Sequence, residues 1–201
     1  MNSNQQISDY IFFYQDVMDK KTCEWIINRY DTTAEWKQST FSNSYKNTGT
    51  SQVAMDEYWI QASAPYYGAI KESFEYCVND YIGAHDKIKS TRYTDFRINR
   101  YKEGGFMNQH IDNIHHSHGQ QFGYPHLTSL LFLNDDYEGG EFVLCGDKHI
   151  EKIQGSAIVF PSWLPHYVKP NKSTANRISI AWNIQLKGQV GEHHEFQSAD
   201  F

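Results

Sequence analysis

Apolar residues recur at helical spacing in two segments of the first half of the chain. Between residues 16 and 31 they follow a period of about 3.6 residues, and Asp19 is a suitable N-cap. Residues 65–82 show the same period, and Pro65 suits the first turn of a helix. Both segments therefore predict amphipathic helices. Their apolar faces comprise Cys23, Ile26, Ile27 and Tyr30 in the first segment and Tyr66, Ala69, Ile70, Phe74, Cys77, Val78 and Tyr81 in the second.

The second half of the chain, from about residue 92, has a residue pattern typical of strands and turns. Residues 127–133 form a nearly continuous apolar run, which is typical of a strand covered on both faces. Gly139 and Gly140 supply the backbone freedom that a hairpin needs. Two helices followed by about eight strands predict an α+β, mainly β domain built as a sandwich or jelly roll. Strands are predicted over 11–14, 96–100, 127–133, 141–144, 150–153, 156–160 and 177–186, and a loop or irregular strand over 37–52.

The length of 201 residues fits one domain with a sizeable core. Within residues 1–201 we expect helical and strand support over 10–90 and a jelly-roll core over 92–187. The polar tails at 1–9 and 189–201 are expected to fray. The formal net charge is -6, so general binding to nucleic-acid phosphates is not expected.

The cysteines and the N-terminal segment indicate the compartment. Cys23, Cys77 and Cys145 are widely spaced and odd in number, which argues against a disulfide framework and for small buried side chains in a reducing environment. The start of the chain shows neither the basic nor the apolar region of a signal peptide, and no apolar run approaches the length of a membrane span. We therefore expect a cytoplasmic protein without membrane contact.

His110 and Asp112 are two residues apart, so they share one face of an extended segment. With His166 they make two imidazoles and one carboxylate, the ligand set that holds non-haem Fe(II) and leaves coordination positions open. The carboxylate favours hydroxylation over halogenation, because halogenating enzymes leave that position to chloride. Four nearby histidines could form a rival metal site: His115, His116, His118 and His126. The simpler interpretation is that they lie in a solvated loop.

Arg177 opens an apolar strand eleven residues beyond His166. A charged side chain that faces inward there needs a partner, because an unpaired buried charge is costly. A guanidinium group matches a carboxylate in geometry, so Arg177 is a candidate for binding the far carboxylate of an organic acid.

Several motifs around these residues resemble one enzyme family. They are Arg100-Tyr101 before His110, Leu133-Asn134 before Glu138-Gly139-Gly140-Glu141-Phe142, the run from Gly155 through Phe160-Pro161-Ser162-Trp163-Leu164-Pro165 to His166, and Arg177 to Ile184. Together they resemble the prolyl 4-hydroxylase-like branch of the 2-oxoglutarate/Fe(II)-dependent dioxygenases, and most closely its bacterial and phage members. The resemblance covers most of the chain and is specific from about 96 to 184.

This resemblance implies a double-stranded β-helix, a cupin-like jelly roll with helices packed outside the larger sheet. It makes His110, Asp112 and His166 the catalytic iron ligands, and it pairs Arg177 with the C5 carboxylate of 2-oxoglutarate. Tyr101 would hydrogen-bond that cosubstrate. The implied reactants are Fe(II), 2-oxoglutarate and O2, with ascorbate as a supporting reductant. The cell would be a bacterium or a phage-infected host.

One position departs from the family pattern. Several prolyl hydroxylases carry a tyrosine where this chain has Phe132, which lacks the hydroxyl that helps to hold the C5 carboxylate. Thr128 or Ser179 could replace it, or Tyr101 could serve both purposes. Four further residues are candidates for substrate contact, each with a purely structural alternative: Arg97, Asn99, Asn113 and Trp182.

The expected function is hydroxylation of a substrate C–H bond, in a protein or peptide as in a prolyl 4-hydroxylase. A small-molecule or free amino-acid hydroxylase would need the same core. Other classes also remain open: a non-catalytic metabolite-binding jelly roll, a cupin-type metal dioxygenase without 2-oxoglutarate, and a structural or virion-associated protein. The sequence leaves the substrate and the oligomeric state undetermined.

Overall fold

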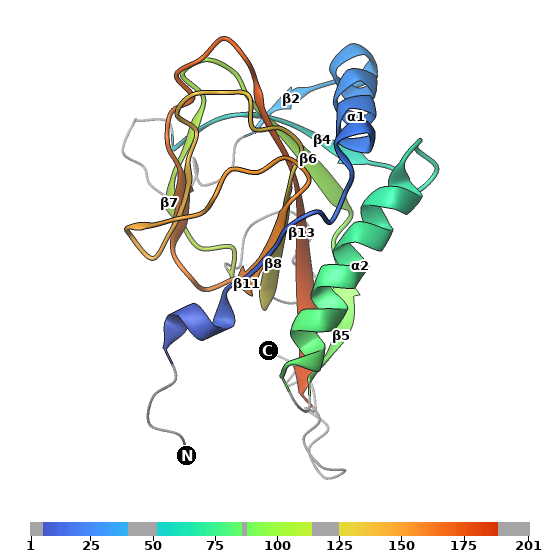
Figure 1. Ribbon diagram of the computed structural model, residues 1–201, viewed down its shortest axis with the longest axis vertical. Helices are drawn as coiled ribbons and strands as arrows, with labels where there is room; N and C mark the ends of the chain where they lie inside the picture. The colour runs from blue at the N-terminus through green and yellow to red at the C-terminus, as the bar shows by residue number, and fades with distance from the viewer. Residues whose placement is uncertain (1–5, 40–51, 86–87, 114–124, 189–201) are drawn as a thin grey trace, which may run out of the picture.

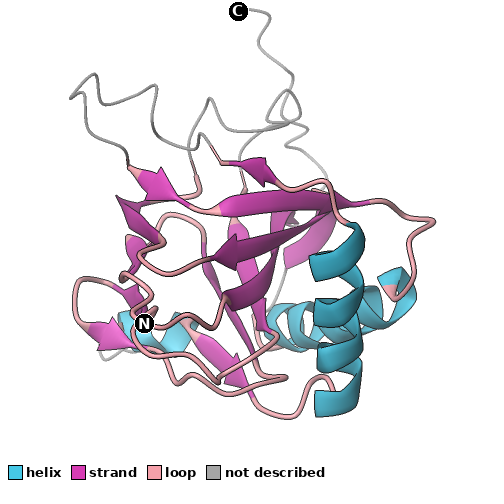
Figure 2. Ribbon diagram, turned by 90° about the horizontal axis from the view of Figure 1, so that it is seen from above, coloured by secondary structure: helices cyan, strands magenta, loops and turns pink. Residues whose placement is uncertain are grey.

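The computed structural model describes residues 6–39, 52–85, 88–113 and 125–188. In this part of the chain two antiparallel sheets face each other, and both long helices cover the outer side of the larger one (Figures 1 and 2). The larger sheet has the order β1-β11-β8-β13-β6-β4-β2, with β5 also paired to β13, and the smaller has the order β10-β9-β12-β7-β3. The mainly β prediction with outer helices is thus confirmed.

The strand bounds follow from the backbone pairing. The larger sheet contains β1 Phe12–Tyr14, β2 Lys37–Gln38, β4 Asp56–Ile60, β5 Ile88–Tyr93, β6 Phe96–Tyr101, β8 Leu127–Phe132, β11 Ala157–Pro161 and β13 Arg177–Gly188. The smaller sheet contains β3 Val53–Ala54, β7 Phe106–His110, β9 Phe142–Leu144, β10 Lys148–His149 and β12 His166–Val168.

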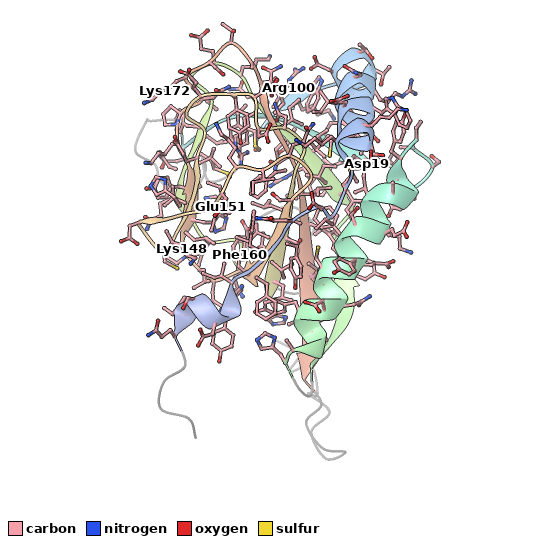
Figure 3. The ribbon with its side chains drawn as sticks, viewed as in Figure 1. Asp19, Arg100, Lys148, Glu151, Phe160 and Lys172 are labelled. Carbon is pink, nitrogen blue, oxygen red and sulfur yellow. The ribbon has the colours of Figure 1, made fainter. Side chains whose placement is uncertain are left out.

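The helix α1, Lys20–Thr33, begins where the sequence places its cap. The Asp19 carboxylate accepts a hydrogen bond from the backbone N–H of Thr22 at 2.9 Å, which satisfies a donor of the first turn. Its C-terminal half is tied to the sheet by Arg100 of β6, which reaches Asp31 at 2.8 Å (Figure 3). The prediction of a helix is confirmed, although it starts at Lys20 rather than at residue 16.

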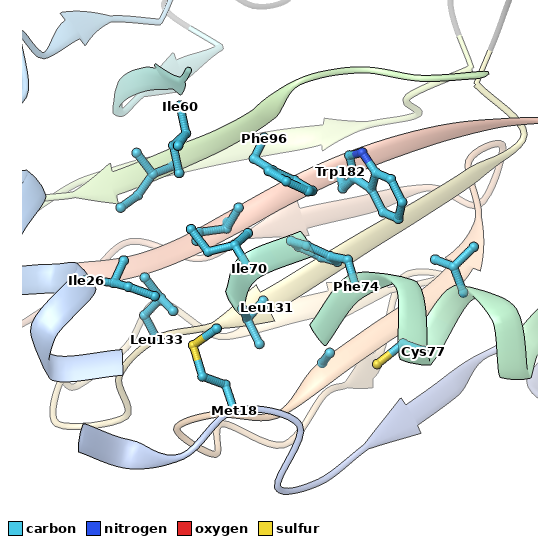
Figure 4. Close-up of a cluster of buried hydrophobic side chains, with 14 of the residues drawn as sticks. Met18, Ile26, Ile60, Ile70, Phe74, Cys77, Phe96, Leu131, Leu133 and Trp182 are labelled. Atoms are coloured by element: carbon cyan, nitrogen blue, oxygen red, sulfur yellow. The ribbon is translucent and has the colours of Figure 1, made fainter. Parts of the chain in front are cut away.

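The second helix, α2, spans Tyr67–Gly83 and packs its apolar face on the larger sheet. It begins after Tyr66, whose left-handed backbone (φ 66°) precludes a helical turn at Pro65. Phe74 stacks on Phe96 with ring centroids 5.4 Å apart and contacts Trp182 at 5.5 Å (Figure 4). This outer core is almost fully buried and holds the helices to the sheet.

A second, smaller apolar cluster lies between the two sheets. Phe142 of β9 meets Phe160 of β11 with ring centroids 5.8 Å apart, and Met107 of β7 and Leu130 of β8 belong to the same cluster. The strands of the larger sheet therefore present alternate residues to the helices and to the space between the sheets. The candidate site lies on this inner face.

The structure corrects some of the predicted boundaries. Residues 150–153 are not a strand, and the short β10 lies just before them. The strands β3 and β4 were not predicted, and residues 40–51 of the expected loop lie outside the described residues. The expected N-terminal tail includes a short 3₁₀ helix, η1, at Ile7–Tyr10. No helix among the described residues is long and apolar enough to cross a membrane.

Candidate metal centre

Two strands of the smaller sheet bring the two predicted imidazoles together. In the antiparallel pairing of β7 and β12, His110 lies opposite His166, and their ring centroids are 4.2 Å apart. Asp112 follows β7, and its backbone N–H donates to the carbonyl of Ser162 at 2.9 Å. The pairing therefore assembles three residues that span 57 positions of sequence (166 − 110 + 1).

The donor atoms converge on one point. The Nε2 atoms of His110 and His166 lie 3.4 Å and 3.6 Å from Oδ1 of Asp112. One donor atom from each of the three residues lies within 4.8 Å of the others. A metal ion about 2.1 Å from nitrogen and oxygen ligands can reach all three. Within the described part of the chain, this is the one cluster of His, Cys, Asp and Glu with such geometry.

Both imidazoles are held in the orientation that a metal requires. Nδ1 of His110 is 2.8 Å from the carbonyl oxygen of Asn108, and Nδ1 of His166 is 2.9 Å from that of Leu164. A proton on Nδ1 donated to each carbonyl leaves Nε2 unprotonated and facing Asp112. Burial, together with the neighbouring His166, lowers the pKa of His110, which favours the neutral ring that binds metal.

The Asp112 carboxylate is buried and fixed by a side chain of the opposite sheet. Thr128 of β8 donates to its Oδ2 at 2.8 Å and lies 3.0 Å from the hydroxyl of Ser162. Burial opposes ionisation, but His166 and then His110 hold the pKa of Asp112 well below its usual range. The ligand set thus consists of two imidazoles and one carboxylate, which fits Fe(II) and similar divalent metals.

Arg177, at the start of β13, is 1% exposed and faces the space between the sheets. Its Nε donates to the carbonyl of Gly140 at 2.9 Å, and its Nη1 donates to the Ser179 hydroxyl at 3.2 Å. Its Cζ lies 4.8 Å from the centre of the Tyr101 ring. Nη2 has no hydrogen-bond partner among the described residues. A buried guanidinium with an unpaired donor fits an anionic ligand.

Gly140 is required by this arrangement. Its φ is +62°, and a Cβ there would lie 3.0 Å from Cδ of Arg177 and 3.1 Å from the ring of Tyr137. The glycine lets its own carbonyl approach the guanidinium. The Gly-Gly pair was predicted only as a hairpin turn, so its contact with Arg177 is new.

Tyr137 is a site residue that the sequence analysis missed. It is 4% exposed, and burial raises its pKa, against the opposing effects of the Arg177 charge and a hydrogen bond with that side chain. Its position, three residues before Gly140, is the one sequence signal that could have identified it. The Tyr137 hydroxyl therefore lies beside Arg177, whereas Phe132 has no hydroxyl group.

The structure separates the predicted partners of Arg177. Ser179 contacts it directly, whereas Thr128 binds Asp112 and belongs to the metal centre. Tyr101 places its ring on the guanidinium, and its hydroxyl lies 3.9 Å from the sulfur of Met107. Phe132 lies 5.8 Å from the guanidinium carbon. The expected hydrogen bond from Tyr101 to a cosubstrate stays a prediction.

The four candidate substrate residues divide into two groups. Arg97 and Asn99 share the inner face of β6 with Tyr101, between β4 and β13. Trp182 lies on the opposite face of β13, packed among the helices, so its assignment to the site is wrong. Asn113 donates its side-chain amide to the carbonyl of Pro125 at 2.8 Å, which gives it a structural role.

Most of the rival histidine site lies outside the described residues, so it stays an alternative. His126 accepts a hydrogen bond at Nδ1 from the backbone N–H of Leu186 at 2.9 Å, and burial lowers its pKa. The other members, His115, His116 and His118, lie outside the described residues.

Comparison with known sequences gives a family match over the residues of the candidate site. Residues 96–185 match the model of the 2OG-Fe(II) oxygenase superfamily. A PKHD-type hydroxylase of Stenotrophomonas maltophilia is 33% identical over 98 residues, which is 45% of this chain and 43% of the relative. A PKHD-type hydroxylase of Shewanella sp. strain ANA-3 is 34% identical over 100 residues, or 47% and 45% of the two chains. The chain thus spans less than half the length of these relatives.

Solved structures show the fold. A Pseudomonas putida prolyl-4-hydroxylase superposes with a TM-score of 0.67 at 15% identity, over 88% of this chain and 92% of that one. A Trichoplax adhaerens prolyl hydroxylase in complex with a hypoxia inducible factor peptide gives 0.64 at 19%, over 88% and 84%. The predicted jelly-roll fold is confirmed by this likeness, and the described residues form two sheets and no closed barrel. Residues 96–185, which match the 2OG-Fe(II) oxygenase superfamily model, carry all three candidate metal ligands and Arg177.

Proposed function

We propose that this protein is an Fe(II)- and 2-oxoglutarate-dependent dioxygenase that hydroxylates a substrate C–H bond. The observation that carries the proposal is the pairing of a three-ligand metal centre with a buried, incompletely bonded arginine on the facing sheet. The family match over the same residues supports it.

The overall reaction balances as follows. Fe(II), when bound, supplies oxygen activation, and 2-oxoglutarate supplies two of the four electrons that reduce O2. One oxygen atom enters succinate as CO2 leaves, and the other is inserted into the substrate C–H bond to give an alcohol.

The protein's own residues fix where these reactants bind. His110 and His166 direct Nε2 toward Asp112, and the carbonyls of Asn108 and Leu164 prevent the rings from turning. Thr128 holds one oxygen of Asp112 and leaves the other facing the imidazoles. These hydrogen bonds orient the donor atoms before any ligand binds, which lowers the cost of assembling the site.

Arg177 would hold the C5 carboxylate of 2-oxoglutarate through its unpaired Nη2. Gly140 and Ser179 already occupy Nε and Nη1, so the guanidinium cannot turn away from the inner face. Tyr101 covers one side of it, and burial strengthens the attraction between the two charges. Tyr137 is placed to provide the hydroxyl that Phe132 lacks.

Two substrate classes remain as candidates under this reaction. The Trichoplax adhaerens neighbour binds a peptide, which supports a protein or peptide substrate for this chain. A free amino acid or another small molecule would use the same core. A non-catalytic metabolite-binding role is less well supported, because the complete ligand set and its hydrogen-bonded supports are intact.

The test is an anaerobic titration of the apoprotein with Fe(II) and 2-oxoglutarate, followed by aerobic assays of succinate. A visible charge-transfer band that needs both additions, and succinate release with and without ascorbate, are expected. Turnover without 2-oxoglutarate would favour a cupin-type dioxygenase instead. We place the reaction in the cytoplasm; the three free cysteines support a reducing compartment.

A further inference from the structure

Asn171, in the connection between β12 and β13, is 1% exposed and lies where separate segments of the chain meet. Its backbone N–H donates to the carbonyl of Gly105 at 2.9 Å, and its own carbonyl accepts from the N–H of Gly104 at 2.7 Å. It also forms an antiparallel bridge with Gly139. The backbone of Asn171 therefore joins the turn between β6 and β7 to the Gly-Gly pair.

The side-chain amide of Asn171 makes four further contacts. Its Nδ2 donates to the carbonyl of Tyr101 at 3.0 Å and to the carbonyl of Ala175 at 2.8 Å. Its Oδ1 accepts from the N–H of Ser173 at 3.2 Å and from the Ser173 hydroxyl at 3.2 Å. Both donors and both lone pairs of the amide are thus used within the protein, so this side chain holds backbone and does not bind a ligand.

The segments held by this amide carry the groups that surround Arg177. Tyr101 lies opposite Arg177 in the pairing of β6 with β13, and its ring lies 4.8 Å from the guanidinium carbon. Gly140 follows the bridged glycine, and its carbonyl accepts from Nε of Arg177 at 2.9 Å. Ala175 precedes Arg177 by two residues. One buried asparagine therefore fixes the backbone on three sides of the arginine.

The metal centre is supported by other contacts. The backbone of Asp112 is held by the carbonyl of Ser162, and its carboxylate is held by Thr128. Within the described part of the chain, no hydrogen bond of Asn171 reaches a metal ligand or one of these supports. Loss of the Asn171 amide should therefore disturb the surroundings of Arg177 and spare the metal centre.

A buried amide with all its bonds made could serve stability alone, but the placement of its donors favours a role in binding. Both donated bonds end on carbonyls adjacent to Arg177, one on the facing strand and one two residues earlier in the chain. Nη2 of Arg177 has no hydrogen-bond partner among the described residues. The direction of that donor is set by the backbone around the arginine, which Asn171 holds.

We propose that Asn171 is a positioning residue for the cosubstrate, which keeps the backbone around Arg177 in the arrangement that points Nη2 at the C5 carboxylate of 2-oxoglutarate. The inference rests on the proposed function and adds a residue that does not touch the ligand. Removal of the amide leaves the carbonyls of Tyr101 and Ala175 without a buried donor, so the local backbone shifts and the affinity for 2-oxoglutarate falls.

Anaerobic absorbance titration of the Fe(II)-loaded protein with 2-oxoglutarate tests the proposal. Asn171→Ala should raise the Kd for 2-oxoglutarate about tenfold, because two hydrogen bonds that hold the site are lost. Iron content after desalting should stay at the wild-type level. Thr174→Ala, at an exposed position of the same turn, and Lys148→Met, at an exposed position of β10 (Figure 3), are controls that should bind 2-oxoglutarate as the wild type does.

A double variant separates positioning from general stability. If Asn171 acts through Arg177, Asn171→Ala should change the Kd for 2-oxoglutarate by no more than about twofold in the Arg177→Met background. Urea denaturation checks that each variant is folded. Should Asn171→Ala fail to fold, the milder Ser173→Ala, which removes one bond to Oδ1, takes its place and should raise the Kd about two- to tenfold.

The possible failures are distinguishable. A wild-type protein that shows no absorbance band with Fe(II) and 2-oxoglutarate would refute the proposed function, and this inference with it. If the band forms and the folded variant binds 2-oxoglutarate as tightly as the wild type, only the role of Asn171 is wrong. Equal losses of iron and 2-oxoglutarate, or a full additional loss in the Arg177→Met background, would show a merely structural role and would also overturn the assignment.

Discussion

The two faces of the larger sheet are built from the same strands and have opposite character. On the outer face, Ile178, Ile180 and Trp182 of β13 pack against the helices in a nearly dry core. On the inner face, Arg177 and Asn183 of the same strand carry polar atoms without partners. Alternation along one strand thus separates the residues that stabilise the fold from those that we propose bind ligands.

The two faces differ in whether their buried groups have partners within the protein. The outer face satisfies its apolar surface with the helices and needs nothing further. The inner face keeps buried polar atoms without a hydrogen-bond partner among the described residues, such as Nη2 of Arg177 and Oδ1 of Asn183, and we propose that bound ligands offset the cost of burying them. Substitutions on the outer face should therefore change stability, and those on the inner face should change binding and turnover.

The largest effect is expected at the metal centre. Asp112→Ala removes the one anionic ligand, and because loss of an outer-shell partner alone costs about 10- to 100-fold, turnover should fall by more than about 1000-fold. Succinate release and bound iron after desalting are the measurements, with the exposed Asp147→Ala as the control. Near-normal iron content in Asp112→Ala would contradict the ligand assignment.

A substitution on the outer face should lower stability and leave turnover unchanged. Phe74 is fully buried between α2 and the rings of Phe96 and Trp182. Phe74→Ala should lower the free energy of unfolding by about 3–5 kcal/mol. Urea denaturation measures this loss, and Tyr76→Ala, at an exposed position of the same helix, should cost far less. Turnover per folded molecule should stay at the wild-type level; a specific loss of catalysis would undermine the division between the faces.

A substitution of Arg177 on the inner face should change the affinity for 2-oxoglutarate alone. Arg177→Met removes the charge and should weaken 2-oxoglutarate binding by about 10- to 100-fold, as expected for a lost charge-assisted hydrogen bond. Iron affinity should be unchanged, because the arginine makes no contact with the three metal ligands in the described structure. Titration of each variant with 2-oxoglutarate at saturating Fe(II) provides the measurement, with Lys148→Met beside it.

Adjacent residues of β8 give the sharpest contrast between the faces. Thr128 donates to Asp112, whereas the hydroxyl of Ser129 points to the other face and has no hydrogen-bond partner among the described residues. Thr128→Val should weaken iron binding by about tenfold or more. Ser129→Ala should leave iron binding unchanged. Equal effects of the two substitutions would contradict the assignment of Thr128.

The smallest effect concerns the cysteines of the outer face. Burial, aided by neighbouring carboxylates, raises the pKa of Cys23 and Cys77 to about 12. At pH 8 only about one in ten thousand of these thiols is a thiolate, and that fraction rises with pH. Cys145 is partly exposed and should react first with a thiol reagent in the native protein. Earlier labelling of Cys77, followed by mass spectrometry, would contradict the packing of α2.

Much of the fold is predictable from the sequence because the spacing of apolar residues reflects which side chains are buried. The apolar run 127–133 and the helix cap at Asp19 are purely local signals, and the structure confirms both. β4 was missed because Asp56 and Glu57 resemble solvent-facing residues, although Glu57 faces the interior. A sequence alone cannot distinguish a buried charge from an exposed one.

The site shows the same limit. The spacing of His110 and Asp112 predicts a shared face, and the β7–β12 pairing confirms that His166 joins them. Thr128 and Tyr137 acquire their contacts from the register of distant strands and turns, which no local pattern reveals. The Trp182 error was avoidable, because a residue five positions after an inward-facing Arg177 points to the other face.

The most direct test of the account is the anaerobic absorbance titration with Fe(II) and 2-oxoglutarate. The wild-type protein should develop a charge-transfer band that saturates with one iron and one 2-oxoglutarate per chain. The band should be absent in Asp112→Ala and should need a higher 2-oxoglutarate concentration in Arg177→Met. A wild-type protein without the band, or an Asp112→Ala variant that retains it, would contradict the assignment of this inner face as an iron and 2-oxoglutarate site.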